Sequence, residues 1–88
     1  MTHELKTWPE YFQAVKSGKK TFEVRSTLDR EFKVGELLFL REYDYQRGRY
    51  TGDELLTRIT YMLQGGDFGI EPNYCVMGLG PISASALF

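Results

Sequence analysis

The clearest periodic pattern lies near the N-terminus, where apolar residues recur at helical spacing. Trp8, Tyr11, Phe12 and Val15 stand at i, i+3, i+4 and i+7, so a helix would carry them on one stripe. We therefore predict a helix over residues 7–17 with this stripe packed on the core. Stacking of the rings on nucleic-acid bases is the alternative role for the aromatic members.

Both ends of this helix carry boundary signals. Thr7 can cap the N-terminus, and Glu10 stands three residues later, as in a capping box. Lys16 suits the negative end of the helix dipole. Gly18 is typical of the position just past a helix, because glycine tolerates the left-handed backbone found there.

Apolar segments separated by turn residues predict strands in the rest of the chain. The predicted strands are Lys20–Arg25, Glu36–Tyr43, Leu55–Leu63 and Tyr74 to about Gly80, with a possible short strand at residues 3–5. Residues 44–53 are expected to be a hairpin loop, and residues 81–88 form a weakly patterned tail. One helix followed by several strands predicts an α+β domain in which the sheet closes into a small barrel and the helix packs against it.

The strand at Lys20–Arg25 alternates apolar and polar side chains. Phe22 and Val24 would share one face, while Glu23 and Arg25 would share the other. We expect the apolar pair to face the core and the polar residues to face solvent or a cleft. A carboxylate between Lys20 and Arg25 would be fixed in orientation, and the two cations could meet a phosphate. The alternative is a solvated strand face whose ion pairs are worth ~0–1 kcal/mol.

Composition adds few constraints. The 88 residues make a single domain, 1–88, and the formal net charge is −1. This balance argues against broad, non-specific nucleic-acid binding, although residues 1–33 carry seven Lys and Arg against five Asp and Glu. Cys75 has no partner for an internal disulfide, and it lies in an apolar segment as a buried hydrophobe would. With no signal peptide and no long apolar run, we expect a cytoplasmic protein that does not enter the membrane.

The segment GKKTFEVR, residues 18–25, matches the pattern G-x-K-x-x-E-x-R, which resembles the signature of the ASCH domain. The segments HELKTWPEYFQAVKSGKKTFEVR, FKVGELLFLREYD, YTG and ITYML are similar to a small bacterial and phage branch of ASCH-like proteins. ASCH domains belong to the PUA-like superfamily of β-barrels, for which RNA binding has been proposed. The resemblance therefore implies a PUA-like mixed β-barrel with an N-terminal helix packed against it.

The resemblance also implies a ligand site in a cleft between barrel and helix. Gly18 would serve the backbone geometry, while Lys20, Glu23 and Arg25 would contact the ligand. Asp29 and Arg30 resemble a further pair of this branch and would form the rim of the cleft. The opening H-x-L-K also resembles the branch, and it adds His3 and Lys6 as candidates. The implied ligand-binding residues are thus Gly18, Lys20, Glu23, Arg25, Asp29, Arg30, His3 and Lys6.

Three functions follow from these observations. The first is binding of RNA, a nucleotide or a modified nucleoside in the cleft. The second is hydrolysis of a modified nucleoside, with Lys20 and Glu23 as catalytic residues, because an ASCH relative hydrolyses acetylated cytidine. In that relative, the presumed nucleophilic threonine falls where this chain has Glu23. The third is an accessory role that acts through a protein partner. We expect no cofactor and no metal, because one His and one Cys lack ligand spacing.

Overall fold

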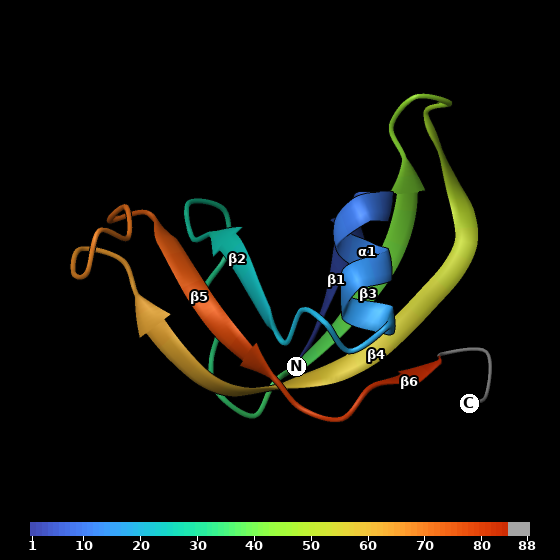
Figure 1. Cartoon of the computed structure of the whole chain (residues 1–88). Coiled ribbons are helices and arrows are strands. Elements are labelled where there is room, and N and C mark those ends of the chain that lie inside the picture. Colours follow the sequence, from blue (N-terminus) through green and yellow to red (C-terminus); the bar gives the residue numbers. More distant parts are fainter. Residues whose placement is uncertain (85–88) are drawn as a thin grey trace.

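The computed structural model describes residues 1–84 and shows one short helix beside a strongly curved, mixed β-sheet (Figure 1). The elements in chain order are β1 (Thr2–Thr7), α1 (Pro9–Lys16), β2 (Phe22–Ser26), β3 (Leu37–Asp44), β4 (Arg49–Gln64), β5 (Tyr74–Leu79) and β6 (Ser83–Ala84). The predicted α+β class is confirmed.

The strand order of the sheet is β1-β3-β4-β5-β2, with β6 paired to β4. β1 runs parallel to β3, and the other pairs are antiparallel. The long strand β4 joins the two halves of the sheet, because it pairs with β3 as far as Arg58 and with β5 from Ile59 onward. The pairing register with β5 shifts between Ile59 and Tyr61. β4 bends through the molecule, and the two halves of the sheet rise from this bend with α1 between them (Figure 1).

The sheet does not close into a barrel. β1 and β2 are its two edges, and no backbone pairing joins them within residues 1–84. The expected closure is therefore wrong. As a result, only side chains can link the two edge strands to one another.

The helix is shorter than predicted at its start. It begins at Pro9, and the N-cap residue Trp8 makes no side-chain capping bond. Thr7 is instead the last residue of β1, where its hydroxyl donates to the carbonyl of Leu5, so the capping-box prediction is wrong. The C-terminal prediction is confirmed: Gly18 has a φ of 83°, and its N–H donates to the carbonyl of Val15.

The largest departures from the predicted strands are the early start of β4 and the added strand β6. β4 begins at Arg49, because Arg49 to Glu54 continue the ladder with the end of β3 and leave only residues 45–48 as the turn. The tail expected at 81–88 adds the short strand β6, whose Ser83 pairs with Leu56. Residues 85–88 of that tail lie outside the described part of the chain.

The hydrophobic core lies between the helix and the concave side of the sheet. Phe12 and Val15 are completely buried, as the stripe predicted. They join residues of β1, β3, β4 and β5 and the loop after β2: Leu5, Phe32, Leu38, Leu40, Leu55, Ile59, Cys75 and Met77. Cys75 is thus a buried free thiol, as expected.

Within residues 1–84, no helix has both the length and the apolar character needed to cross a membrane.

Candidate ligand-binding cleft

A cleft of about 670 Å³ opens between the two edge strands, next to the start of α1. β1 contributes its last two residues, α1 contributes its first turn and the residue before it, and β2 with its preceding loop contributes the opposite wall. The lining residues are Lys6, Thr7, Trp8, Tyr11, Lys20, Phe22, Glu23, Val24 and Arg25. The motif residues Lys20, Glu23 and Arg25 therefore converge in one concave site.

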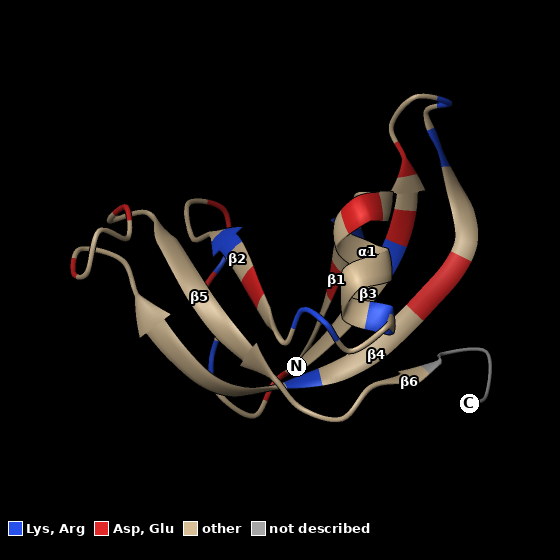
Figure 2. Cartoon of the chain, viewed as in Figure 1, with Lys and Arg blue, Asp and Glu red and all other residues tan. Residues whose placement is uncertain are grey.

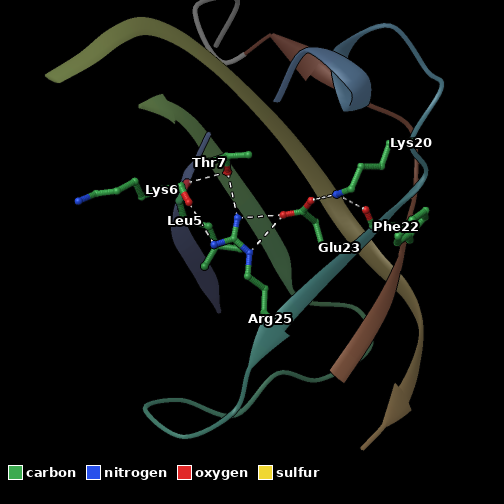
Figure 3. Close-up of polar contacts among 7 residues, drawn as sticks. All are labelled: Leu5, Lys6, Thr7, Lys20, Phe22, Glu23 and Arg25. Atoms are coloured by element: carbon green, nitrogen blue, oxygen red, sulfur yellow. Dashed lines mark hydrogen bonds and ion pairs between the residues drawn. The ribbon is translucent and has the colours of Figure 1, made fainter. Parts of the chain in front are cut away.

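Glu23 is the centre of this site, and it is only 3% exposed. Its Oε2 accepts a hydrogen bond from the Nζ of Lys20, and its Oε1 accepts from Arg25 through Nε at 3.2 Å and Nη2 at 2.9 Å (Figure 3). Both carboxylate oxygens are thus held by cations. Pairing of this kind offsets the cost of burying a charge.

Arg25 links the two edges of the open sheet. From β2, its Nη1 donates to the backbone carbonyl of Lys6 at 3.1 Å, and its Nη2 donates to Oγ1 of Thr7 at 3.0 Å (Figure 3). Both acceptors belong to β1. The guanidinium therefore replaces, with side-chain bonds, the backbone ladder that a closed barrel would have here.

Lys20 is positioned by the turn after the helix. The left-handed conformation of Gly18 reverses the chain, and the backbone N–H of Lys20 then donates to the carbonyl of Ala14 at 2.9 Å. The Lys20 ammonium also donates to the carbonyl of Phe22 at 2.8 Å. It lies 5.9 Å from the ring centroid of Tyr11 and 5.1 Å from that of Phe22, within the range of cation–π attraction.

The face prediction for β2 is wrong for Phe22 and Val24, which are not in the core, whereas Glu23 and Arg25 line a cleft as expected. Glu23 is buried, whereas Phe22 and Val24 are 44% and 49% exposed. Glu23 and Arg25 do share a face, as the alternation required, but that face is turned inward. The reason is that the inward face offers hydrogen-bonding partners on β1 and in the preceding loop. No buried side-chain nitrogen or oxygen within residues 1–84 lacks a partner.

Aromatic rings form a wall of the cleft that the sequence pattern assigned to the core. Trp8 and Tyr11 are 49% and 50% exposed, so for them the core prediction is wrong. Their rings are stacked with centroids 6.2 Å apart, and the ring of Tyr45 supports Trp8 at 5.0 Å. A helix this short buries only one side, so Phe12 and Val15 occupy the core contact and the other half of the stripe faces the cleft.

A second hollow, of about 450 Å³, adjoins the cleft on the side of the loop after β2; we call it the side hollow. Lys6 and Arg25 line both cavities. The two rim candidates, Asp29 and Arg30, line the side hollow and do not line the cleft. The structure thus places Lys6 where the cleft and the side hollow meet. It places Asp29 and Arg30 outside the cleft that Lys20, Glu23 and Arg25 line.

His3 lines neither cavity. Its ring is buried, packs on Phe32 with centroids 4.5 Å apart, and donates from Nε2 to Oε1 of Glu36 at 2.8 Å. This hydrogen bond, with a second from the backbone N–H of Lys33, lowers the pKa of the Glu36 carboxyl below its usual 4.5. His3 therefore ties β1 to the start of β3 in the described structure and is neither a free tail nor part of the cleft.

The family model described as "Domain of unknown function (DUF3850)" matches residues 2–79. The chain belongs to the DUF3850 family. No protein in the curated collection matches it at a significant level. In this DUF3850 chain, the matched region includes every strand and helix that lines the cleft.

The charge of the cleft is positive overall. Lys6, Lys20 and Arg25 oppose the single carboxylate of Glu23 among its lining residues. Basic residues gather in the loop after α1, β2 carries one acidic and one basic residue, and β5 carries no charge (Figure 2). The bonds described above use two of the three N–H groups of Lys20 and leave one N–H on Nη1 of Arg25 free. These N–H groups can donate hydrogen bonds to an anion or to the carbonyl edge of a base beside the aromatic wall.

Few groups in the cleft suit nucleophilic catalysis. The hydroxyl of Thr7 donates to the carbonyl of Leu5 at 3.3 Å and accepts from Arg25, so no base is placed to deprotonate it. Thr21 is exposed and does not line the cleft, and Thr57 is bonded to the carbonyl of Gly80. Within residues 1–84, no group of three or more His, Cys, Asp or Glu side chains is placed to hold a metal ion.

Proposed function

We propose that this DUF3850 chain binds a nucleotide, free or as part of RNA, in the cleft between β1, α1 and β2. One observation carries the proposal: two cations, fixed by a buried carboxylate, lie beside half-exposed aromatic rings in a cavity of about 670 Å³. Small-molecule sites in proteins typically have this volume and a few polar groups held in fixed positions.

The two parts of a nucleotide match the two parts of the cleft. A base can stack on Trp8, Tyr11 or Phe22, and such stacking is worth about 1–3 kcal/mol per base. Phosphate or a base carbonyl can meet the free N–H groups of Lys20 and Arg25. The formal net charge of −1 gives little general attraction to polyanions, so a short or specific ligand is favoured over long RNA.

Glu23 acts as a positioning residue in this proposal. Its oxygens are occupied by Lys20 and Arg25, and its side chain is nearly inaccessible. It aims the two cations and does not touch the ligand. This differs from the contact role that the family resemblance implied for it.

The resemblance of residues 18–25 to the ASCH signature supports the same proposal. We propose that the fold is PUA-like, with the gap between β1 and β2 left open as the ligand site. We also propose a cytoplasmic location, where the thiol of Cys75 would stay reduced. The hydrolase alternative has weaker support, because the hydroxyl of Thr7 has no base beside it.

Trp8 is the single tryptophan of the chain, so its fluorescence reports on the cleft alone. The experiment titrates the protein with AMP, CMP, GMP and UMP and follows quenching of Trp8. We expect saturable quenching by at least one nucleotide, with an affinity that falls as salt rises.

Variants make this test specific. Lys20→Ala should weaken binding at least five-fold, whereas Lys19→Ala, an exposed lysine outside the cleft, should stay within two-fold of the parent. Tyr11→Ala should weaken binding by roughly ten-fold through lost stacking. Absence of saturable quenching by all four nucleotides and by a single-stranded RNA 12-mer would exclude the proposal and favour a role through a protein partner.

A further inference from the structure

The side hollow continues the cleft around Arg25. Arg25 and Lys6 line both cavities, so the side hollow adjoins the cleft at these two residues. The volume of the hollow, about 450 Å³, lies within the range of ligand pockets. The hollow is therefore large enough for a second unit of the same ligand.

Arg30 is a cation of the side hollow that has no partner among the described residues. It is half-buried, and the structure gives it no hydrogen bond, ion pair or ring contact within residues 1–84. Other cations of the described chain near the hollow are engaged: Arg25 holds Glu23, and Arg41 holds Glu4 at 2.6 Å. A half-buried guanidinium with free donors in a concave site is suited to an incoming anion.

An aromatic ring also faces the side hollow. Tyr50 lines it and is 39% exposed. Arg41 lies 3.9 Å from the centroid of the Tyr50 ring, and Tyr43 packs edge-on against it at 5.1 Å. The ammonium of Lys6 lies 4.2 Å from the ring centroid of Tyr43, on this same side. The hollow thus repeats the chemistry of the cleft, with a cation beside a fixed ring.

The charge balance of the hollow sets the class of anion. Lys6, Arg25 and Arg30 oppose Glu4 and Asp29 among its lining residues, which leaves a net charge of +1. A phosphodiester carries one negative charge, whereas a terminal phosphate approaches two near neutral pH. The carboxylate of Asp29, beside Arg30 in the chain, would repel the second charge of a terminal phosphate.

We infer that the ligand is a single-stranded di- or oligonucleotide, with one base in the cleft, the phosphodiester between Arg25 and Arg30, and the next nucleotide in the side hollow. This inference rests on the proposed function, since it assumes that the cleft holds a base. It excludes mononucleotides as the preferred ligand class.

The test compares AMP, CMP, GMP and UMP with the dinucleotides ApA, CpC, GpG and UpU in the Trp8 fluorescence titration. The dinucleotide of the best-binding base should bind at least ten-fold more tightly than its mononucleotide. Arg30→Ala should remove most of that gain, reduce the salt slope for the dinucleotide by about one, and leave the mononucleotide affinity within two-fold.

Two further variants complete the design. Arg49→Ala removes an exposed arginine that lines neither cavity, and it should change neither affinity. Asp29→Asn should improve binding of the mononucleotide carrying a terminal phosphate relative to the dinucleotide. If mononucleotides bind but dinucleotides bind no better, or if Arg30→Ala weakens both equally, the two-unit inference is overturned while the proposed function stands. If neither class binds, the proposed function itself fails.

Discussion

Replacement of Glu23 by Gln tests whether the ion-pair network of the cleft holds the open sheet together. Glu23 is 3% exposed, while the side chains of Lys20 and Arg25 are 18% and 23% exposed. Gln keeps the size of the side chain but leaves two adjacent cations without a counter-charge. Removing one partner of a buried ion pair costs roughly 3–5 kcal/mol. Because both cations are partly solvated, we expect the lower end, about 3 kcal/mol.

The assay is urea unfolding followed by far-ultraviolet circular dichroism. With a denaturant slope of about 1–3 kcal/mol per molar urea for a small domain, the midpoint should fall by roughly 1–3 M. Such a loss is large against the ~5–15 kcal/mol total stability of ordinary domains. A double-mutant cycle with Lys20→Met should show a coupling of about 0.5–3 kcal/mol, because the two residues are in contact.

Glu31→Gln is the matched control. Glu31 pairs with Lys33 at 3.6 Å, but both side chains are largely exposed, so no measurable shift of the midpoint is expected. The reasoning is refuted if Glu23→Gln and Glu31→Gln shift the midpoint equally. In that case the ion pairs of Glu23 with Lys20 and Arg25 contribute nothing measurable to stability.

Three more outcomes follow from the fold. Phe12→Ala should lower the free energy of unfolding in urea by about 3–5 kcal/mol, because the ring is completely buried. Tyr11 is half-exposed, so Tyr11→Ala should lower it by less than about 1 kcal/mol. The hydrogen bond from His3 lowers the pKa of the Glu36 carboxyl in the folded protein below its usual 4.5. The ionised carboxylate therefore stabilises the fold fully above pH 4.5, and this stabilisation is lost as the pH falls through the lower pKa of the folded state. Glu36→Gln should make the unfolding free energy less dependent on pH in this acid range. Burial raises the pKa of the Cys75 thiol above 9.0, so a thiol reagent should label it only as urea opens the sheet.

Local patterns in the sequence predicted the helix and most strands correctly. The stripe at Phe12 and Val15, the left-handed glycine at position 18 and the strand after Glu36 all depend on residues close in the chain. The first half of β4 gave no such signal. Residues 49–53 extend beyond the core, so no apolar alternation marks them, and only their pairing with the end of β3 makes them a strand.

The candidate site was predicted in its residues but not in its geometry. The spacing of Glu23 and Arg25 correctly placed them on one face of β2. Which face points inward depends on the carbonyl of Lys6 and the hydroxyl of Thr7, which lie on a distant edge strand. A local pattern assigns the more apolar face to the core, and here the paired polar face is buried instead. The side hollow likewise depends on how the loop after β2 meets β1.

The aromatic wall shows the same limit. Helical spacing placed Trp8 and Tyr11 on the stripe with Phe12, yet the helix contacts the sheet along only part of that stripe. Their separation into core and cleft depends on the width of the gap between β1 and β2. The sequence of the helix contains no information on the distance between these two strands.

The most direct test of nucleotide binding in the cleft is a nitrogen-15 NMR titration that follows two side-chain signals. The signals are the indole N–H of Trp8 and the Nε–H of Arg25. Trp8 precedes α1 and Arg25 belongs to β2, and both residues line the cleft. Addition of the best-quenching nucleotide should shift both signals with one saturation curve, together with the backbone amides of β2. Shifts confined to other strands, or none at saturating nucleotide, would contradict a nucleotide site between β1, α1 and β2.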